Sequence, residues 1–494
     1  MLDVVQPKSL GSVCILGAGK TGLVVAAYLC AHPGYASKLV LYTGSTHMPS
    51  SPQLAHLAQQ GLSIVASDQV TEDFDLCIAS PGIPPHALLY TSACAHCREV
   101  IGEPEFAWRC RPQRWVAITG TNGKTTTTTL IDHMIRADHK QACAVGNIGR
   151  ACLGEVDHHL ADTWFVAELS SFQLAETKML HPRAAILLNI TPDHIEWHGS
   201  MQAYAAAKER IFANLTTDDL AIISRDDLYC KAIYSRLVER GLNPVCIDTS
   251  QDPKTLQAAY CSNSMLYVRL NGTTTPLIKT SEAALKGVHN IQNMLAAAAL
   301  ALFIGVSVDA IRQVLQTFTT LEHRLEYVAT VHGVSFVNDS KATNTDSVEK
   351  ALTAFPNGST IVLLGGHDKQ TDLSSLVHQV VRKCKGAICF GEAGQRIYHE
   401  LVSVQHAQGT PDTHDVSDTC NNATTTAALP FVTCVPHLRD AFDCAVAHAK
   451  PHTTVLLSPA CSSFDEFHNM EERGTYFKKL VHELRATSDN EKLS

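Results

Sequence analysis

Short apolar runs alternate with helical patterns along the 494-residue chain. The first run, residues 13–16, precedes a glycine-containing loop and a helical pattern that continues to about Cys30. Similar runs follow at residues 39–42 and 75–79. Runs of this length are typical of buried parallel strands, and their alternation with helices predicts a doubly wound α/β sheet.

The alternation continues in two further segments. A polar stretch with Pro and Arg, residues 109–114, predicts a domain boundary, and the Ala-rich segment 290–302 predicts a helix. Further strands are expected at 115–119, 164–169, 184–190, 335–338, 360–364, 386–390 and 454–457.

We therefore predict an α/β protein of three domains, at 1–112, 113–322 and 323–494. The first and third are expected to be Rossmann-like, and the central one to contain a parallel sheet of the P-loop ATPase type. Residues 405–428 are rich in Thr, Asn, Asp and His. They predict a mobile surface insertion in the third domain.

Composition narrows the classes of function. A hydrophobic content of 45% and a charged content of 18% fit a soluble globular protein. The net charge of −9, without a basic run, argues against binding to nucleic acid or to an anionic membrane. No apolar run reaches the roughly 18 residues of a membrane span, and the N-terminus lacks a signal-peptide pattern, so we expect a cytoplasmic protein.

The 17 cysteines are expected to act mainly as small buried apolar residues. Cys94 and Cys97 form an isolated Cys-x-x-Cys pair. A zinc site would need two more ligands at similar spacing, which do not follow.

The loop after the first strand, Gly-Ala-Gly-Lys-Thr-Gly at 17–22, fits the Gly-x-Gly-x-x-Gly pattern of dinucleotide-binding turns. Glycines there let the backbone approach a pyrophosphate at a helix N-terminus. NAD binding also requires a carboxylate about 20 residues later, and the second strand ends in Tyr42 and Thr43 instead. The loop alone leaves three alternatives, which are NAD, another nucleotide diphosphate, or a tight turn without a ligand.

The loop Gly-Thr-Asn-Gly-Lys-Thr at 120–125 lies between an expected strand and an expected helix. The standard phosphate loop needs a first glycine at position 118, where Ile118 stands, but Gly123, Lys124 and Thr125 keep its second half. Lys124 would lie against the β- and γ-phosphates of ATP, and the Thr125 hydroxyl can bind Mg²⁺. The alternative is a Thr-rich turn before a helix.

Three more groups follow expected strands or lie in an expected helix. Glu168 ends an apolar run, at the edge of the sheet where parallel sheets bind ligands. His194 ends Asn-Ile-Thr-Pro-Asp-His, and as a ligand of Mg²⁺ it is chemically a second choice to oxygen. Lys208 lies in a helical stretch. Without further information, His194 is an ordinary loop histidine and Lys208 a solvated lysine.

These motifs together resemble the ATP-dependent Mur ligase superfamily, which also includes folylpolyglutamate synthases and cyanophycin synthetases. Glu-Leu-Ser-Ser-Phe-Gln-Leu (168–174), His-Arg-Leu-Glu (323–326) and Ser-Pro-Ala-Cys-Ser-Ser-Phe-Asp (458–465) are similar to the D-glutamate-adding branch. The resemblance covers residues 13 to about 474. Folylpolyglutamate synthases lack the N-terminal glycine-loop domain that is present here.

The resemblance implies roles for individual residues. Lys124, Glu168, His194 and Lys208 would be catalytic, and Mg²⁺ would be held by Thr125, Glu168, His194 and Lys208, the last as a carbamate formed with carbon dioxide. The residues that would bind ATP are Gly120, Thr121, Asn122, Gly123, Lys124, Thr125, Thr126, Asn290, Asn293, Arg324 and Asp339. Those that would bind the other substrates are Gly17, Gly19, Lys20, Thr21, Gly22, Thr43, Asn147, Ser170, Gln173, Lys341, Thr343, Lys369, Ser463 and Phe464. For Asn290, a role as a helix N-cap is compatible with nucleotide binding.

The resemblance further implies a monomeric ligase in which the three domains bind a UDP-substrate, ATP and an amino acid. UDP-N-acetylmuramoyl-L-alanine and D-glutamate would be joined through an acyl phosphate in peptidoglycan synthesis. The alternative within this class is another amino-acid-adding amide ligase; a P-loop switch protein, an NAD-dependent dehydrogenase and a non-enzymatic binding module fit fewer of the motifs. The chain departs from the family pattern at Tyr42, where an acidic residue is frequent, at Met470, where an aromatic is frequent, and at 405–428.

Overall fold

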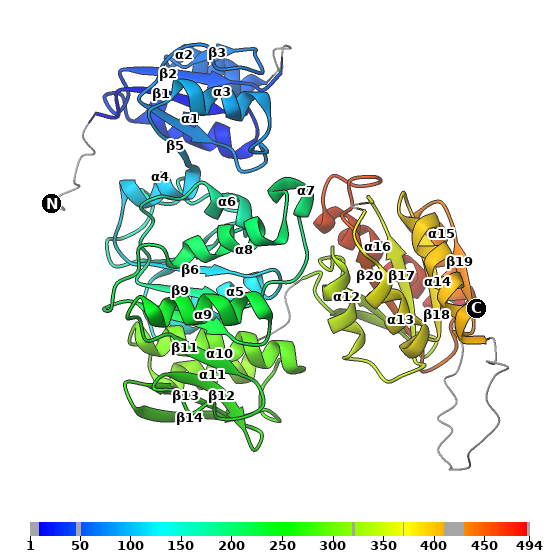
Figure 1. Ribbon diagram of the computed structural model, residues 1–494. Coiled ribbons are helices and arrows are strands. Elements are labelled where there is room, and N and C mark those ends of the chain that lie inside the picture. The colour runs from blue at the N-terminus through cyan, green and yellow to red at the C-terminus, as the bar shows by residue number, and fades with distance from the viewer. Residues whose placement is uncertain (1–8, 46–50, 319–321, 369, 410–428, 492–494) are drawn as a thin grey trace. The chain divides into compact units, whose positions relative to one another are not determined.

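The computed structural model describes residues 9–45, 51–318, 322–368, 370–409 and 429–491 (Figure 1). The chain divides into two compact units, Met1–Phe318 and Thr319–Ser494. Within the described residues, no helix has both the length and the apolar character to cross a membrane. The sequence prediction of an α/β fold built on parallel sheets is confirmed.

The first unit begins with a five-stranded parallel sheet in the order β3-β2-β1-β4-β5. Its strands are β1 (Ser12–Leu16), β2 (Lys38–Tyr42), β3 (Ser63–Val65), β4 (Leu76–Ala79) and β5 (Val100–Gly102). Its helices are α1 (Lys20–Ala31), α2 (Pro52–Gln59), α3 (Leu88–His96) and α4 (Glu103–Cys110). The chain reverses its direction across the sheet between β1 and β4, which is where open α/β sheets bind ligands.

Alternate residues of β1 enter two different apolar clusters, because successive strand side chains point to opposite faces. Val13 and Ile15 pack with residues of α1 and α2. Cys14 and Leu16 pack with Leu89 and Ala93 of α3. Both faces of the sheet are therefore covered, which explains the continuous apolar run in the sequence.

The second sheet of this unit has nine strands in the order β14-β13-β12-β11-β10-β9-β6-β8-β7. These strands are β6 (Trp115–Thr119), β7 (Ala142–Gly146), β8 (Trp164–Glu168), β9 (Ala184–Leu187), β10 (Leu220–Ser224), β11 (Val245–Asp248), β12 (Ala258–Ser262), β13 (Met265–Leu270) and β14 (Thr273–Lys279). The accompanying helices are α5 (Lys124–Ala137), α6 (Ser171–Ala175), α7 (Ile195–His198), α8 (Met201–Glu209), the 3₁₀ turn η1 (Arg210–Phe212), α9 (Leu228–Glu239), α10 (Val288–Phe303) and α11 (Val308–Thr317).

The strands from β7 to β12 are parallel, whereas β13 and β14 add an antiparallel meander that the sequence analysis did not predict. Its two turns are short, and their central residues, Asn263 with Ser264 and Asn271 with Gly272, all have positive φ. Turns of this kind match the twist of antiparallel strands, and Asn-Gly is their strongest sequence signal. That signal was present in the sequence at 271–272.

The second unit contains a six-stranded sheet in the order β15-β16-β20-β17-β18-β19, in which only β15 and β16 pair antiparallel among the described strands. The strands are β15 (Glu326–Val331), β16 (Val334–Asn338), β17 (Thr360–Gly365), β18 (Gly386–Phe390), β19 (Val432–Cys434) and β20 (Thr454–Ala460). The helices are α12 (Thr345–Leu352), α13 (Ser374–Lys383), α14 (Gly394–Gly409), α15 (Leu438–His448) and α16 (Met470–Glu491). Apolar residues from α12, α13 and α14 cover one face of this sheet, and those from α15 and α16 cover the other.

Residues 405–409, which were expected to belong to the insertion at 405–428, are the end of α14. Residues 410–428 and Lys369 lie outside the described residues.

Arg473 of α16 is fully buried and connects two strand ends of this sheet. Its Nε donates to Ser340 Oγ at 3.0 Å, and Nη2 donates to the Ser340 carbonyl at 2.9 Å. Nη1 donates to the carbonyls of Cys461 and Ser462 at 3.0 and 3.1 Å. Burial lowers the pKa of Arg473 to about 10, so the side chain remains cationic at neutral pH.

Replacement of Arg473 by methionine is expected to destabilise the protein by roughly 3 kcal/mol or more, because it leaves buried carbonyl oxygens without donors. Arg473→Lys keeps the charge but not the planar fork, so a large part of that loss should remain. Urea denaturation of the purified variants measures this effect. The matched control is Arg439→Met, since Arg439 is an exposed arginine that pairs with Asp443. Equal denaturation midpoints for the 473 and 439 variants would contradict the assignment.

Candidate active site

The loop between β6 and α5 is held by side chains at its own edge of the sheet. Lys124 Nζ donates to the carbonyls of Gly120 and Thr121 at 2.9 and 2.8 Å. The Asn122 amide donates to Asn189 Oδ1 at 2.8 Å, and Asn189 Nδ2 donates back to the Asn122 carbonyl at 3.2 Å. Asn189 follows β9, which lies next to β6, so two neighbouring strand ends fix the loop.

Gly123 is required at its position for two reasons. Its φ is +84°, a left-handed conformation that favours glycine. A Cβ atom there would also lie 2.3 Å from Oδ1 of Asn293, on α10. The close approach brings Asn293, which is 2% exposed, directly against the loop at 120–123.

The prediction that Asn290 is the N-cap of α10 is wrong. The helix begins at Val288 with Gly287 as its N-cap, so Asn290 lies inside the first turn. Its Nδ2 donates to the Lys286 carbonyl at 2.9 Å, and its Oδ1 accepts from Asn293 Nδ2 at 3.2 Å. Asn290 thereby orients Asn293 beside the loop.

Lys208, on α8, contacts the same loop although it is distant in the sequence. Its side chain is 1% exposed, and Nζ donates to the Gly120 carbonyl at 2.7 Å. Burial lowers the pKa of Lys208 far below its ordinary value, and the neighbouring charge of Lys124 lowers it further. The carboxylates of Asp193 and Glu168 act in the opposite direction, which shows that both lie near the amine. The expectation of a solvated lysine is therefore wrong.

Glu168, at the end of β8, offers one occupied and one unoccupied oxygen. Oε1 accepts from Asn147 Nδ2 at 2.9 Å, and the Asn147 amide donates to the Glu168 carbonyl at 2.8 Å. Oε2 is buried and has no hydrogen-bond partner among the described residues. A buried oxygen without a donor is costly, and a carboxylate oxygen is a ligand that Mg²⁺ prefers. This edge of the sheet therefore fits a magnesium ion.

His194 is the N-cap of α7, with a φ of +54°. The centroid of its ring lies 4.7 Å from the ring centroid of Phe172. The ring of His198 also stacks on Phe172, with 5.6 Å between the ring centroids. The Nε2 atom of His198 lies 2.9 Å from Ser171 Oγ. Burial, with the charges of His194 and Lys208, lowers the pKa of His198 to about 4, so His198 is neutral at physiological pH.

Ser170 and Gln173, expected to contact the substrate, form a capping box at the start of α6. Ser170 Oγ accepts from the Gln173 amide at 3.2 Å, and Gln173 Oε1 accepts from the Ser170 amide at 2.9 Å. The two side chains therefore stabilise the turn that follows Glu168, whatever else they contact.

The first glycine loop, at the end of β1, is a tight turn of the expected kind. The Gly17 amide donates to the Tyr42 carbonyl at 2.8 Å. A Cβ atom on Gly22 would lie 1.9 Å from the Gly17 carbonyl oxygen, so α1 packs too closely on the loop for any side chain. Lys20 Nζ donates to the Gly149 carbonyl at 2.5 Å, and Thr43 Oγ1 donates to the Ser45 carbonyl at 2.8 Å. Gly19 is the N-cap of α1, and Thr21 lies in its first turn.

Tyr42, where the family pattern frequently has an acidic residue, is a core residue that is 2% exposed. Its ring packs edge-on against Phe74 at 6.2 Å between centroids.

Ser80, which follows β4 next to the Gly17 turn, is a functional candidate that no motif in the sequence identified. Its buried hydroxyl has no hydrogen-bond partner among the described residues. A polar residue directly after the apolar run of β4 was the signal that could have identified it.

In the second unit, Asp339 follows β16 and is 4% exposed. Its carboxylate accepts from the Leu325 amide at 3.1 Å and from Ser458 Oγ at 2.7 Å. Burial raises the pKa of Asp339 to about 6, although the charge of Arg324 and the Ser458 hydroxyl oppose the shift. The segment around Arg324 is thus tied to the strand end.

The residues expected to bind the amino acid lie on adjoining loops of this unit. The Lys341 amide donates to the His323 carbonyl at 3.0 Å, and the Thr343 amide donates to the Lys341 carbonyl at 2.9 Å. The Ala460 amide donates to the Ala342 carbonyl at 2.9 Å, which connects this loop to the one that carries Ser463 and Phe464. Ser463 is buried, whereas Phe464 is 68% exposed.

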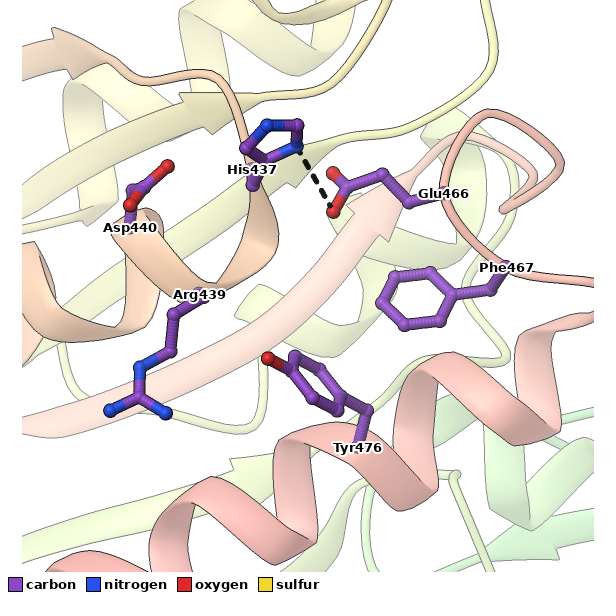
Figure 2. A pocket seen from close by; sticks show the side chains of 6 residues that line it. All are labelled: His437, Arg439, Asp440, Glu466, Phe467 and Tyr476. Atoms are coloured by element: carbon purple, nitrogen blue, oxygen red, sulfur yellow. Dashed lines mark ion pairs between the residues drawn. The ribbon is translucent and has the colours of Figure 1, made fainter.

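A cavity of about 460 Å³ opens nearby (Figure 2). It is lined by His437, Arg439, Asp440, Glu466, Phe467 and Tyr476. His437 and Glu466 pair at 3.6 Å, and Arg439 pairs with Asp443 at 2.9 Å. Its cationic groups already face carboxylates, so the cavity offers little to a dicarboxylate ligand such as an acidic amino acid.

The structure thus gathers Gly120, Lys124, Lys208, Asn293 and Glu168 at one edge of the central sheet. Arg324, Asp339, Lys341, Thr343, Ser463 and Phe464 belong to the second unit. At this edge of the central sheet, Asn189 and His198 are further functional candidates, in addition to Ser80 in the N-terminal sheet, that the sequence motifs did not identify. Both lie within or next to a quoted motif, but their partners are distant in sequence.

Comparison with known proteins agrees with this geometry. Residues 118–301 match the family described as Mur ligase middle domain, and residues 323–461 match the Mur ligase glutamate ligase domain. The UDP-N-acetylmuramoylalanine–D-glutamate ligase of Acidobacterium capsulatum is 37% identical and covers 95% of each chain. The enzyme of the same name from Caldicellulosiruptor bescii is 34% identical and covers 96% of this chain and 98% of its own.

Solved structures share the fold. A UDP-N-acetylmuramate–alanine ligase from Thermotoga maritima matches with a TM-score of 0.55 and 17% identity, covering 96% of this chain and 99% of its own. A pseudomurein peptide ligase type C from Methanothermus fervidus matches with a TM-score of 0.52 and 14% identity, covering 90% and 96%. On the strength of the near full-length relatives, the chain belongs to the UDP-N-acetylmuramoylalanine–D-glutamate ligase family of Mur ligases.

Proposed function

We propose that this chain uses ATP to join D-glutamate to UDP-N-acetylmuramoyl-L-alanine, a step in the synthesis of peptidoglycan precursors. The observation that carries the chemistry is the meeting of Lys124 and buried Lys208 on the carbonyl of Gly120. The identity of the amino acid follows the name shared by the near full-length relatives.

The three sheets suggest that three domains, 1–112, 113–322 and 323–494, each bind a different substrate. The glycine turn at the switch point of the first sheet would hold the uridine diphosphate, through Gly17, Gly19, Lys20, Thr21 and Gly22, with Thr43 beside them. The central loop would bind the phosphates of ATP. The third domain would contribute Arg324 and Asp339 to ATP and would bind D-glutamate.

The chemistry begins with a carboxylate, which is a poor acyl donor at neutral pH. A carboxylate oxygen of the L-alanyl group attacks the γ-phosphorus of ATP, and the bond to ADP breaks. The amine of D-glutamate then attacks the acyl carbon, phosphate leaves, and the nitrogen loses a proton. Lys124 would stabilise the negative charge that accumulates on the transferred phosphoryl group.

Thr125, Glu168, His194 and Lys208 are the residues that would hold Mg²⁺. The ion would screen the converging charges of the phosphates and the attacking carboxylate. The unoccupied Oε2 of Glu168 supports this assignment. Asn147 would act as a positioning residue, since it holds the other oxygen of Glu168.

Lys208 can become a magnesium ligand only if its cation is removed. An amine adds to carbon dioxide in its neutral form, the N–C bond forms as the amine loses a proton, and a carbamate carboxylate results. Burial lowers the pKa of Lys208 well below its ordinary value, which favours the neutral amine that this reaction needs. We propose that Lys208 is carbamylated in the active enzyme.

D-glutamate carries two carboxylates, which require cations and hydrogen-bond donors. Lys341, Thr343, Lys369 and Ser463 would meet that need, and exposed Phe464 would cover the ligand at the rim. We further propose that the enzyme is a cytoplasmic monomer whose partners are its small-molecule substrates.

ADP release with UDP-N-acetylmuramoyl-L-alanine, ATP and Mg²⁺ is expected to depend on D-glutamate. L-glutamate and the other amino acids added by Mur ligases should give only background release. A coupled ADP assay and mass spectrometry of the nucleotide product check both points. Stimulation by a different amino acid, with none by D-glutamate, would overturn the specificity.

Lys208→Ala is expected to lower kcat/KM by at least about 100-fold, the order of loss found when metal ligation is disturbed. A short carboxylate such as acetate should restore part of the activity, because it can occupy the place of the carbamate. ¹³C-bicarbonate should add a carbamate resonance to the NMR spectrum of the unsubstituted protein. Exposed Lys231 on α9 supplies the control, and Lys231→Ala should behave as the parent protein. Full activity of Lys208→Ala, insensitive to bicarbonate and acetate, would exclude carbamylation.

Glu168→Gln keeps an acceptor for Asn147 but removes the charge. We expect it to raise the Mg²⁺ concentration for half-maximal rate by about 10- to 100-fold. Steady-state rates at varied Mg²⁺ measure this shift. Glu239→Gln, on the exposed end of α9, should leave the Mg²⁺ dependence unchanged. An unchanged Mg²⁺ dependence in Glu168→Gln would remove Glu168 from the metal site.

A further inference from the structure

Three thiols gather on one face of the N-terminal sheet. They belong to Cys14 on β1, Cys77 on β4 and Cys97, which directly follows α3. Their Sγ atoms all lie within 4.8 Å of one another, and those of Cys14 and Cys97 are 3.5 Å apart. None of the three has a role in the proposed ligase reaction.

The backbone, not a flexible loop, sets this arrangement. Cys14 and Cys77 are register partners on adjacent parallel strands. Cys97 forms a β-bridge with Phe74, two residues before β4, and its amide donates to the Ala93 carbonyl at 2.9 Å. All three positions are therefore fixed by main-chain hydrogen bonds of the sheet and of α3.

The spacing of the sulfurs suits a single soft metal ion. Metal–sulfur bonds of about 2.3 Å, in trigonal or tetrahedral geometry, place the sulfurs roughly 3.8–4.0 Å apart. The separations here, from 3.5 Å up to the 4.8 Å limit, bracket that range. Small side-chain rotations would therefore be sufficient, without movement of the strands.

The surroundings favour a thiophilic ion over a hard one. Cys14 and Cys77 are fully buried, among apolar residues that include Leu16, Phe74 and Ala79. Cys97 is partly exposed and offers a route of entry. Cys14, Cys77 and Cys97 are all free cysteines. Thiolate is a soft ligand that selects Zn²⁺ and Cu⁺ over Mg²⁺ and Ca²⁺.

We propose that Cys14, Cys77 and Cys97 form a three-thiolate site for a thiophilic cation, Zn²⁺ or Cu⁺. Binding would form three metal–sulfur bonds and release the thiol protons to solvent, since a coordinated thiol is deprotonated. With Zn²⁺ a fourth position would remain for water, whereas Cu⁺ is satisfied by three sulfurs. Cys94, the first residue of the Cys-x-x-Cys pair, is not part of the site and is exposed on α3.

The test uses the full-length, fully reduced protein under nitrogen. Titration with Co²⁺, a spectroscopic substitute for Zn²⁺, should give thiolate-to-cobalt charge-transfer absorption of an intensity that indicates three sulfurs. Zn²⁺ should then displace Co²⁺ with one equivalent per chain. In a separate arm, Cu⁺ is offered in competition with a colorimetric Cu⁺ chelator. Tight uptake of either ion supports the site, and the two arms identify which ion it prefers.

Cys97→Ala, at the partly exposed position, should lower the affinity for the preferred ion by at least about 100-fold and reduce the cobalt–thiolate absorption. Circular dichroism verifies that this variant is folded. Cys94→Ala, three residues earlier and within α3, is the matched control and should bind the metal as the parent protein does. Equal binding by Cys97→Ala and the parent, or no stoichiometric uptake by the parent, would overturn the proposal. Because the experiment measures metal binding, a negative result would overturn the thiolate site without bearing on whether the chain ligates D-glutamate.

Discussion

The carbonyl oxygen of Gly120 accepts hydrogen bonds from two lysine side chains, Lys124 at 2.9 Å and Lys208 at 2.7 Å. Two ammonium groups on one oxygen repel each other, and Lys208 is in addition removed from water. Burial and the neighbouring charge of Lys124 therefore both lower the pKa of the Lys208 amine. The chemistry that we propose for this edge of the central sheet depends on this shared acceptor, which brings the two lysines together.

The topology explains why the remaining groups meet there. β8, β6 and β9 are neighbours in the central sheet, so Glu168, the loop at 120–123 and Asn189 leave the sheet at the same edge. Helix α10 then closes the loop from the side with Asn293. The second unit repeats the principle, because β16 and β20 are adjacent, and Arg473 holds their two strand ends together from within the core.

Much of this could be predicted from the sequence, because it is local. The strands at 115–119 and 386–390 were correctly bounded, since each is a continuous apolar run that ends in a glycine or polar turn. The loop at 120–123 was predicted to lie between a strand and a helix, and it does lie between β6 and α5. Features that depend on pairing were not predictable in this way. The positions of Cys14 and Cys77 become related only when β1 and β4 align, and the neutral state of His198 depends on its burial near His194 and Lys208. The meander of β13 and β14 is a different case, because its Asn271-Gly272 turn was readable and was overlooked.

The close approach of Gly123 to Asn293 has an evolutionary consequence. The two residues are far apart in the sequence, yet there is no space between them for a single methyl group. A larger residue at 123 would therefore require a smaller one at 293, in addition to relief of the left-handed backbone. The two positions should be inherited as a pair, and a genetic selection for suppressors of a larger residue at 123 should find them on α10 rather than in the loop itself.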